Sequence, residues 1–195
     1  MAEHDLIRYG FDDISRPGDR EAYAREQALL MRYNDPQTSW DERHTLLREL
    51  VECGEDSNVI APFFVARGDR VRLGRKVFIN GGVLISGGAQ VEIGDYTLIA
   101  PSAQLHTVTH PVDPTERQRW AFWAKPIRIG QNVWIGAGAI ICPGVSIGDH
   151  SVIGAGSVVT HDVPACVLAA GNPCQVVRQL DPPDMSTLYE LRERT

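Results

Sequence analysis

The chain has 195 residues, of which 43% are hydrophobic, and a formal net charge of −6. This length predicts one domain, with or without an appended segment, and the composition supplies enough apolar side chains for a core. The acidic balance argues against nucleic-acid binding, and the lack of a membrane-spanning apolar stretch or an apolar signal segment predicts a cytoplasmic protein with no membrane partner.

Residues 1–57 are predicted to form a helical cap. Residues 21–33 carry apolar side chains at helical spacing and predict one helix. Ser39 followed by Glu42 is a capping-box signature, which opens a second predicted helix that continues to about Val51. Two such helices would cover one end of a solenoid, where apolar side chains and unpaired strand edges are otherwise exposed.

A six-residue repeat dominates residues 58–180. In its longest run an aliphatic side chain recurs at Ile129, Ile135, Ile141, Ile147, Ile153 and Val159. Neither a helix nor an ordinary strand has this period, whereas a chain that turns a corner every six residues does, and stacked coils bury each aliphatic against the next. The repeat therefore predicts a mainly β fold, a solenoid of short parallel strands.

Two irregularities interrupt the repeat. The step from Val91 to Ile93 shifts its phase, so we expect a bulge or a longer corner near residues 87–89. Residues 106–127 do not follow the repeat and contain prolines, charges and two tryptophans, which predict a loop that projects from the stack. Loops on a rigid scaffold are common sites of function.

The segment after the repeats, residues 181–195, is predicted to be a C-terminal tail. A short polar helix over residues 183–193 would close the far end of the stack.

The four cysteines, Cys53, Cys142, Cys166 and Cys174, show no paired spacing. Because no export signal is recognised, reduced thiols are expected rather than disulfides. Cys142 follows Ile141 where neighbouring repeats have glycine, so we interpret it as a small core residue.

An ordered set of motifs resembles the maltose/galactoside O-acetyltransferase family. The motifs are Thr109-His110-Pro111, Asn132-Val133-Trp134-Ile135-Gly136, the run from Gly154 to Thr160, and Gly171-Asn172-Pro173-Cys174. The resemblance covers roughly residues 5–180. It implies a left-handed parallel β-helix, a homotrimer, and acetyl transfer from acetyl-CoA to a sugar hydroxyl.

The candidate catalytic residue is His110. A hydroxyl is a poor nucleophile near neutral pH, so its acetylation needs a base within hydrogen-bond reach, and histidine suits this role. His110 matches the family's catalytic histidine, which implies direct attack of the acceptor on the thioester without an acyl-enzyme. The oxyanion would be stabilised by a backbone amide at a solenoid corner. A surface histidine on a polar loop is the alternative.

On the acceptor side, the resemblance implies three binding residues. Asn80 occupies a position where other repeats have glycine, and it matches a family asparagine; the alternative is a turn-capping side chain. Asp12, with Asp13 beside it, lies where the family has an acidic sugar-binding residue. Trp134 matches a tryptophan that lines the cleft, and the alternative is an aromatic residue that packs at a corner.

The resemblance also implies a coenzyme A site along the solenoid, because exposed backbone groups can pair with a pantetheine arm. The matching positions are Gly136, Ala155, Gly156, Thr160, His161 and Arg178. The family usually has lysine at the position of His161, so the affinity for phosphate is expected to be lower or to depend on pH. No metal is expected.

This sequence departs from the family on the acceptor side. Positions where the family has polar or acidic side chains are Ala66, Gly87 and Gly88, so the acceptor is expected to differ from the named sugars. One alternative is a binding or scaffold trimer without turnover. Another alternative is a zinc-dependent enzyme like carbonic anhydrase, which needs three converging histidines. The spacing of His106 and His110 does not fit stacked coils, and no histidine upstream on the solenoid could complete the triad, so both observations argue against this alternative.

Overall fold

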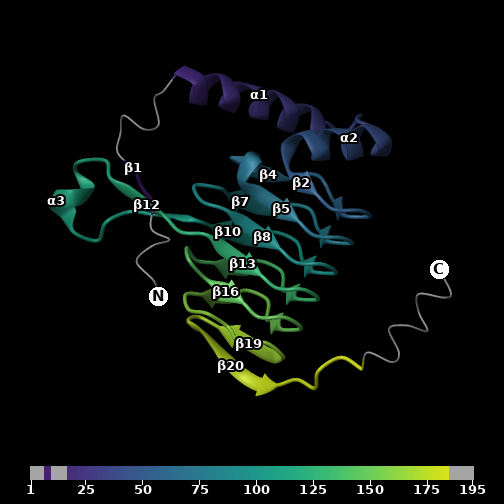
Figure 1. Ribbon diagram of the computed structural model, residues 1–195, viewed down its shortest axis with the longest axis vertical. Coiled ribbons are helices and arrows are strands. Elements are labelled where there is room, and N and C mark those ends of the chain that lie inside the picture. Colours follow the sequence, from purple (N-terminus) through teal and green to yellow (C-terminus); the bar gives the residue numbers. More distant parts are fainter. Residues whose placement is uncertain (1–6, 10–16, 185–195) are drawn as a thin grey trace.

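The structure is a computed structural model that describes residues 7–9 and 17–184. Within these residues, short parallel strands form three faces around a buried apolar core (Figure 1). The first face contains β2 (Glu52–Cys53), β5 (Val71–Leu73), β8 (Val91–Ile93), β13 (Ile127–Ile129) and β16 (Ser146–Ile147). The second contains β3 (Asn58–Val59), β6 (Phe78–Ile79), β9 (Leu98–Ile99), β14 (Trp134–Ile135), β17 (Val152–Ile153), β19 (Val167–Gly171) and β20 (Cys174–Gln179). The third contains β4 (Phe64–Ala66), β7 (Leu84–Ser86), β10 (Gln104–His106), β15 (Ile140–Ile141) and β18 (Val158–Val159). The predicted parallel β-solenoid is confirmed.

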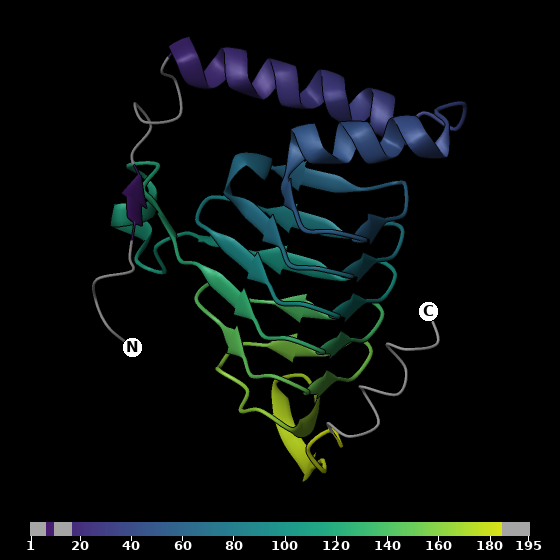
Figure 2. The same cartoon turned by 45° about the vertical axis from the view of Figure 1, so that its right-hand side comes forward.

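Two N-terminal helices cover the end of the stack that begins with β2 (Figure 2). They are α1 (Pro17–Asn34) and α2 (Trp40–Leu50), and α2 turns Leu46, Leu47 and Leu50 into the core. The hydroxyl of Ser39 accepts a hydrogen bond from the Glu42 amide at 3.3 Å, so the predicted helix start is confirmed. α1 begins four residues earlier than the apolar spacing indicated, with a proline in its first turn, where proline is well tolerated.

Asn34, the last residue of α1, joins the helices to the first coil. Its side-chain amide donates to the carbonyl of Phe63 at 2.8 Å, and its side-chain oxygen accepts from the Phe63 amide at 2.8 Å. Phe63 is fully buried. Because buried backbone groups need partners, this one side chain meets the hydrogen-bonding needs of a whole peptide position.

We expect Asn34→Ala to lower the free energy of unfolding by about 1–3 kcal/mol, because both backbone groups of Phe63 would lose their partner. Urea denaturation measures this difference. Gln37→Ala, in the exposed connection between the helices, is the control and should change the free energy by less than about 0.5 kcal/mol. Equal stabilities for the two variants would contradict the role given to Asn34.

The six-residue repeat corresponds to the inward-facing positions of successive coils. Along the second face the aligned residues are Ile79, Ile99, Ile135 and Ile153, each at most 1% exposed. Glycine follows the last two of these four and allows the coils to approach there. A Cβ atom added at Gly136 would lie 2.5 Å from the amide nitrogen of Ala155 in the next coil, so no larger residue fits without moving backbone.

The predicted phase shift is a longer corner between the third and first faces. The aligned aliphatics Ile85 and Ile93 are eight residues apart across this corner, whereas Ile141 and Ile147 in a later coil are six apart. Strands β7 and β8 are each one residue longer than β15 and β16. The additional residues therefore extend this corner. The projecting loop leaves from the same corner in the next coil.

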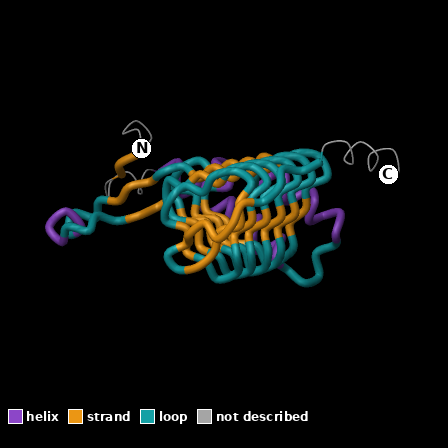
Figure 3. The backbone as a smooth tube through the Cα atoms, turned by 90° about the horizontal axis from the view of Figure 1, so that it is seen from below, coloured by secondary structure: helices purple, strands orange, loops and turns teal. Residues whose placement is uncertain are grey.

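The loop departs after β10 and returns at β13. It contains β11 (Val108–Thr109), α3 (Pro114–Arg117) and β12 (Phe122–Ala124). An N-terminal strand, β1 (Ile7–Tyr9), joins it to form a three-stranded antiparallel sheet in the order β1-β12-β11. Seen from below, this unit extends sideways from the stacked coils (Figure 3).

An antiparallel hairpin of β19 and β20 ends the stack, and the six-residue repeat did not indicate it. Of the helix predicted over residues 183–193, the part from residue 185 onward lies outside the described residues, and residues 183–184 have no regular secondary structure. Among the described helices, none combines the length and apolar character needed to cross a membrane.

Candidate active site

His110 lies in the projecting loop, directly after β11. Its Nδ1 atom is 3.3 Å from the carbonyl oxygen of Ala121, and its exposed ring is tilted against Phe122 with the ring centroids 6.3 Å apart. A carbonyl oxygen only accepts hydrogen bonds, so this contact assigns the proton of the neutral ring to Nδ1. Nε2 is then left with a lone pair, as a general base requires.

The thiols of Cys142 and Cys174 do not have the environment of activated nucleophiles. Burial raises the pKa of Cys142, and it also raises the pKa of Cys174, where a hydrogen bond with Ser157 acts in the opposite direction. Catalytic cysteines instead have a lowered pKa. All four cysteines are free of disulfides, as expected from the sequence.

The corner beneath the loop carries no polar side chain at Ala66, Gly87 or Gly88. A Cβ atom at Gly87 would lie 2.4 Å from the carbonyl oxygen of Ala66, so the backbone itself excludes a larger residue there. A Cβ atom at Gly88 would lie 2.2 Å from Cγ2 of Val108 in β11. Nearby, the hydroxyl of Thr107 accepts from the Ala89 amide at 3.2 Å and donates to a backbone carbonyl. Arg70 also reaches this corner, where its guanidinium donates to the carbonyl of Gly88. The three positions themselves therefore offer only a methyl group and backbone, and the polar side chains beside them are those of Arg70 and Thr107.

Asn80 and Trp134 lie on the second face, away from this corner. Asn80 directly follows β6, and its side-chain oxygen accepts from the Gly81 amide at 2.8 Å, so it caps the turn as the alternative interpretation proposed. Trp134 belongs to β14 and is 54% exposed, with Leu98 beside it in register.

The predicted coenzyme A residues lie on the later coils. Gly136 and the exposed pair Ala155 and Gly156 lie on successive turns of the corner between the second and third faces, where the Gly156 amide donates to the carbonyl of Ala137 at 2.8 Å. A Cβ atom at Gly156 would meet nothing within 4 Å, so the surface there is open.

The other predicted coenzyme A residues lie at the two sides of this corner. Thr160 and His161 follow β18 at the far edge of the third face, and their side chains are hydrogen-bonded at 2.9 Å. Arg178 is exposed on β20, opposite Leu168 of the second face. The six residues thus flank one edge of the solenoid rather than one pocket.

A single chain does not bring the candidate base and the candidate acceptor residues together. The loop with His110 leaves the corner between the third and first faces, whereas Asn80 follows a strand of the second face. The loop also extends away from the stack rather than over it (Figure 3). Asp12, the third candidate, lies outside the described residues.

His106 is placed differently from His110. It ends β10 on the third face, and its Nε2 atom is 2.9 Å from the side-chain oxygen of Gln104. In the described residues, no group of three or more His, Cys, Asp or Glu side chains is arranged around a common point that could hold a metal ion.

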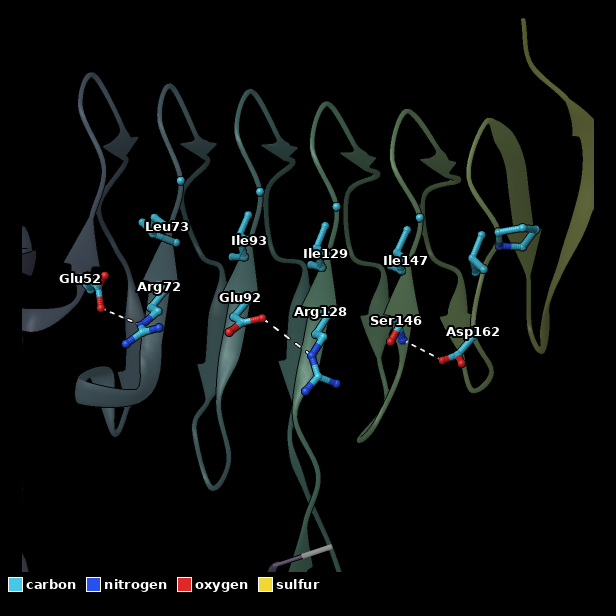
Figure 4. Close-up of a pocket in the computed structure, with 16 residues that line it drawn as sticks. Glu52, Arg72, Leu73, Glu92, Ile93, Arg128, Ile129, Ser146, Ile147 and Asp162 are labelled. Carbon is cyan, nitrogen blue, oxygen red and sulfur yellow. Dashed lines mark hydrogen bonds and ion pairs between the residues drawn. The ribbon is translucent and has the colours of Figure 1, made fainter. Parts of the chain in front are cut away.

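A shallow concavity of about 840 Å³ follows the first face, but it contains none of the predicted site residues. Its side chains form a row across neighbouring strands (Figure 4). Arg72 pairs with Glu52 at 2.7 Å and Arg128 with Glu92 at 3.7 Å. Its arginines are paired with carboxylates, and neither histidine nor cysteine is among the residues that line it.

The second face carries exposed apolar residues that the sequence analysis did not single out. Phe78 and Leu98 are 36% and 48% exposed and lie in the same outward row as Trp134. The sequence could have indicated these residues. Each directly precedes a buried isoleucine and therefore points outward, and outward positions of a solvent-facing strand are normally polar. A row of large exposed apolar side chains marks a surface that packs against something.

Comparisons with known proteins agree with the fold. Residues 126–161 match the family described as bacterial transferase hexapeptide (six repeats). The fold and the motif together define a hexapeptide-repeat transferase.

Relatives of known name narrow this class further. The galactoside O-acetyltransferase of Escherichia coli (strain K12) is 40% identical over 94% of this chain and 92% of its own length. A hexapeptide-repeat acetyltransferase from Vibrio cholerae O1 biovar eltor, solved with acetyl coenzyme A, superposes with a TM-score of 0.84 at 37% identity, covering 87% of this chain and 93% of its own. A maltose O-acetyltransferase from Clostridium difficile 630 gives a TM-score of 0.84 at 34% identity over 87% and 91% of the two chains. The chain belongs to the galactoside and maltose O-acetyltransferase family and is an acetyltransferase.

Proposed function

We propose that this acetyltransferase moves an acetyl group from acetyl-CoA to a hydroxyl of a sugar or related small molecule, with His110 as the general base. The observation that supports this role is the contact between Nδ1 of His110 and the carbonyl of Ala121. It leaves Nε2 as an acceptor on an exposed loop, where a hydroxyl can reach it. Membership in the O-acetyltransferase family supplies the donor and the reaction class.

The reaction takes place in one transfer. Nε2 of His110 removes the proton of the acceptor hydroxyl as its oxygen attacks the thioester carbonyl. The tetrahedral oxyanion is stabilised by a backbone amide at a solenoid corner. When the carbon–sulfur bond breaks, the imidazolium returns the proton to the departing thiolate, and the ester and coenzyme A leave.

Coenzyme A lies along the corner that Gly136, Ala155 and Gly156 form. The open surface above Gly156 accommodates the pantetheine arm next to exposed backbone. Thr160, His161 and Arg178 lie at its two sides and contact the nucleotide half. No metal takes part in this scheme.

The active protein is a homotrimer in which the loop of one protomer reaches the second face of its neighbour. This arrangement brings His110 to Asn80 and Trp134, which one chain keeps apart, and Asp12 completes the acceptor side. It also covers the apolar row of Phe78 and Leu98. We place the trimer in the cytoplasm, where four free thiols are stable.

The acceptor differs from galactosides and maltose because Ala66, Gly87 and Gly88 themselves offer no side-chain hydrogen bonds. The experiment is thiol release from acetyl-CoA across a panel of sugars, glycosides, amines and simple alcohols. We expect release with at least one hydroxyl acceptor, and a slower rate with galactosides and maltose than with the preferred acceptor. If no acceptor raises release above the background of His110→Ala, the catalytic proposal fails and a binding trimer without turnover remains.

A further inference from the structure

The loop that carries His110 is held by a strand from the other end of the chain. β1 pairs antiparallel with β12 along all three of its residues, with Tyr9 opposite Phe122. On its other edge β12 pairs with β11, with Thr109 opposite Trp123. β12 is therefore the central strand of this sheet and β1 is an edge strand.

Both contacts that orient the ring of His110 lie at one end of this sheet. His110 directly follows β11, and the carbonyl that contacts its Nδ1 atom belongs to Ala121, which directly precedes β12. Phe122, whose ring packs against His110, is the first residue of β12. Tyr9 is the residue of β1 opposite Phe122, so β1 spans the end of the sheet where the base is held.

The rest of the loop is held at its root and by contacts of its own, such as the Arg117 guanidinium, which donates to the carbonyl of Val112 at 3.0 Å. Its root is fixed by the Lys125 amide, which donates to the carbonyl of Thr107 at 2.8 Å, and by the contact of Val108 with Gly88. Toward its tip, α3 has no buried residue. A two-stranded ribbon is only marginally stable in water, and a third strand is what makes such a sheet persist.

We infer that β1 is a positioning strand for the catalytic base: by closing the sheet on β12, it holds the His110 ring in the orientation that acetyl transfer requires. The inference rests on the proposed function, because it gives β1 a role in the reaction and not only in packing. β1 touches no reacting atom in this scheme. Its effect passes through β12 and the Ala121 carbonyl.

The test uses proline substitutions in the full-length protein. Neighbouring N–H groups of a strand point to opposite sides, so one of Arg8 and Tyr9 directs its N–H toward β12 and the other directs it outward. Arg8→Pro and Tyr9→Pro are each compared with the alanine variant at the same position. Deletion of residues 1–9 is a second route to the same loss.

We expect one proline variant to have a kcat about 10- to 100-fold below that of its alanine partner, because a small misplacement of a catalytic group slows a reaction by this factor. The other proline variant should have the same kcat as its alanine partner. The KM for acetyl-CoA and the unfolding midpoint should not change, because the coenzyme residues and the core belong to the solenoid. Amide hydrogen exchange in β12 should increase in the slow variant only.

Equal kcat values for both prolines and their alanines, or for the deletion and the intact chain, would overturn the inference, whether or not exchange in β12 increases. A drop in the unfolding midpoint that matches the drop in kcat would also overturn it. The proposed function is tested separately by His110→Ala. If His110→Ala remains active, the assignment of the base fails. If His110→Ala is inactive but both proline variants keep full kcat, only the role of β1 is removed.

Discussion

His110→Gln should lower kcat/KM for acetyl transfer by about 10²- to 10⁴-fold, the range that removal of a general base produces. Glutamine keeps a side-chain amide that can contact the Ala121 carbonyl, but it offers no basic nitrogen. The acceptor hydroxyl would then have to attack without losing its proton. Thiol release from acetyl-CoA, followed with the preferred acceptor, measures the effect.

The specific signature is a loss in kcat with little change in the KM for acetyl-CoA, because His110 lies on the loop and the coenzyme residues lie on the solenoid. His106→Gln is the matched control, since His106 contacts Gln104 on the third face and has no role in the scheme. A His110→Gln enzyme within about threefold of the control would show that another group activates the hydroxyl.

The core and the shape of the solenoid could be predicted from the sequence because they depend on local periodicity. Every sixth residue points inward in each coil, so Ile135 and Ile153 meet through a fixed repeat rather than through a distant contact. The start of α2 at Ser39 was predictable for a similar reason, since a cap is satisfied within three residues.

The site was predictable only in part. The loop could be located because it breaks the repeat, but the pairing of β1 with β12 joins residues more than 110 positions apart, and no periodic signal marks so short a strand. The charged row on the first face and the apolar row on the second also escaped notice. Which outward position meets solvent depends on how the chain associates, and a repeat specifies only the inward positions.

Gly88 shows why the sequence alone limits the prediction of the substrate. Its lack of a side chain was visible in the sequence as a missing hydrogen-bond partner for a sugar. The structure adds that Val108 fills the space that a side chain at this position would need. The packing at Gly88 is therefore shared by two segments, and a polar residue introduced there alone would not restore a sugar site.

Mixed trimers of two inactive variants should recover activity if the site is shared between protomers. In His110→Ala the loop is defective and the second face is intact, whereas in Asn80→Ala the reverse holds. A neighbouring pair with one chain of each kind, in the right order, brings an intact loop to an intact face. Every closed ring of three that contains both kinds of chain has one such pair, so about a third of the sites in mixed trimers should be restored.

The variants are co-expressed with different tags, and the trimers that carry both tags are purified before thiol release is measured. A mixture of His110→Ala with His110→Gln is the control and should stay at the background rate, because no pair contains an intact loop. Asn80 caps its turn through Gly81, so Asn80→Asp, which keeps that acceptor oxygen and removes the amide nitrogen, separates a binding role from a turn defect. If each site were built within one chain, every site in the mixture would keep one defect and activity would not return. Recovery therefore decides whether the second face of one protomer and the loop of another form a single active site.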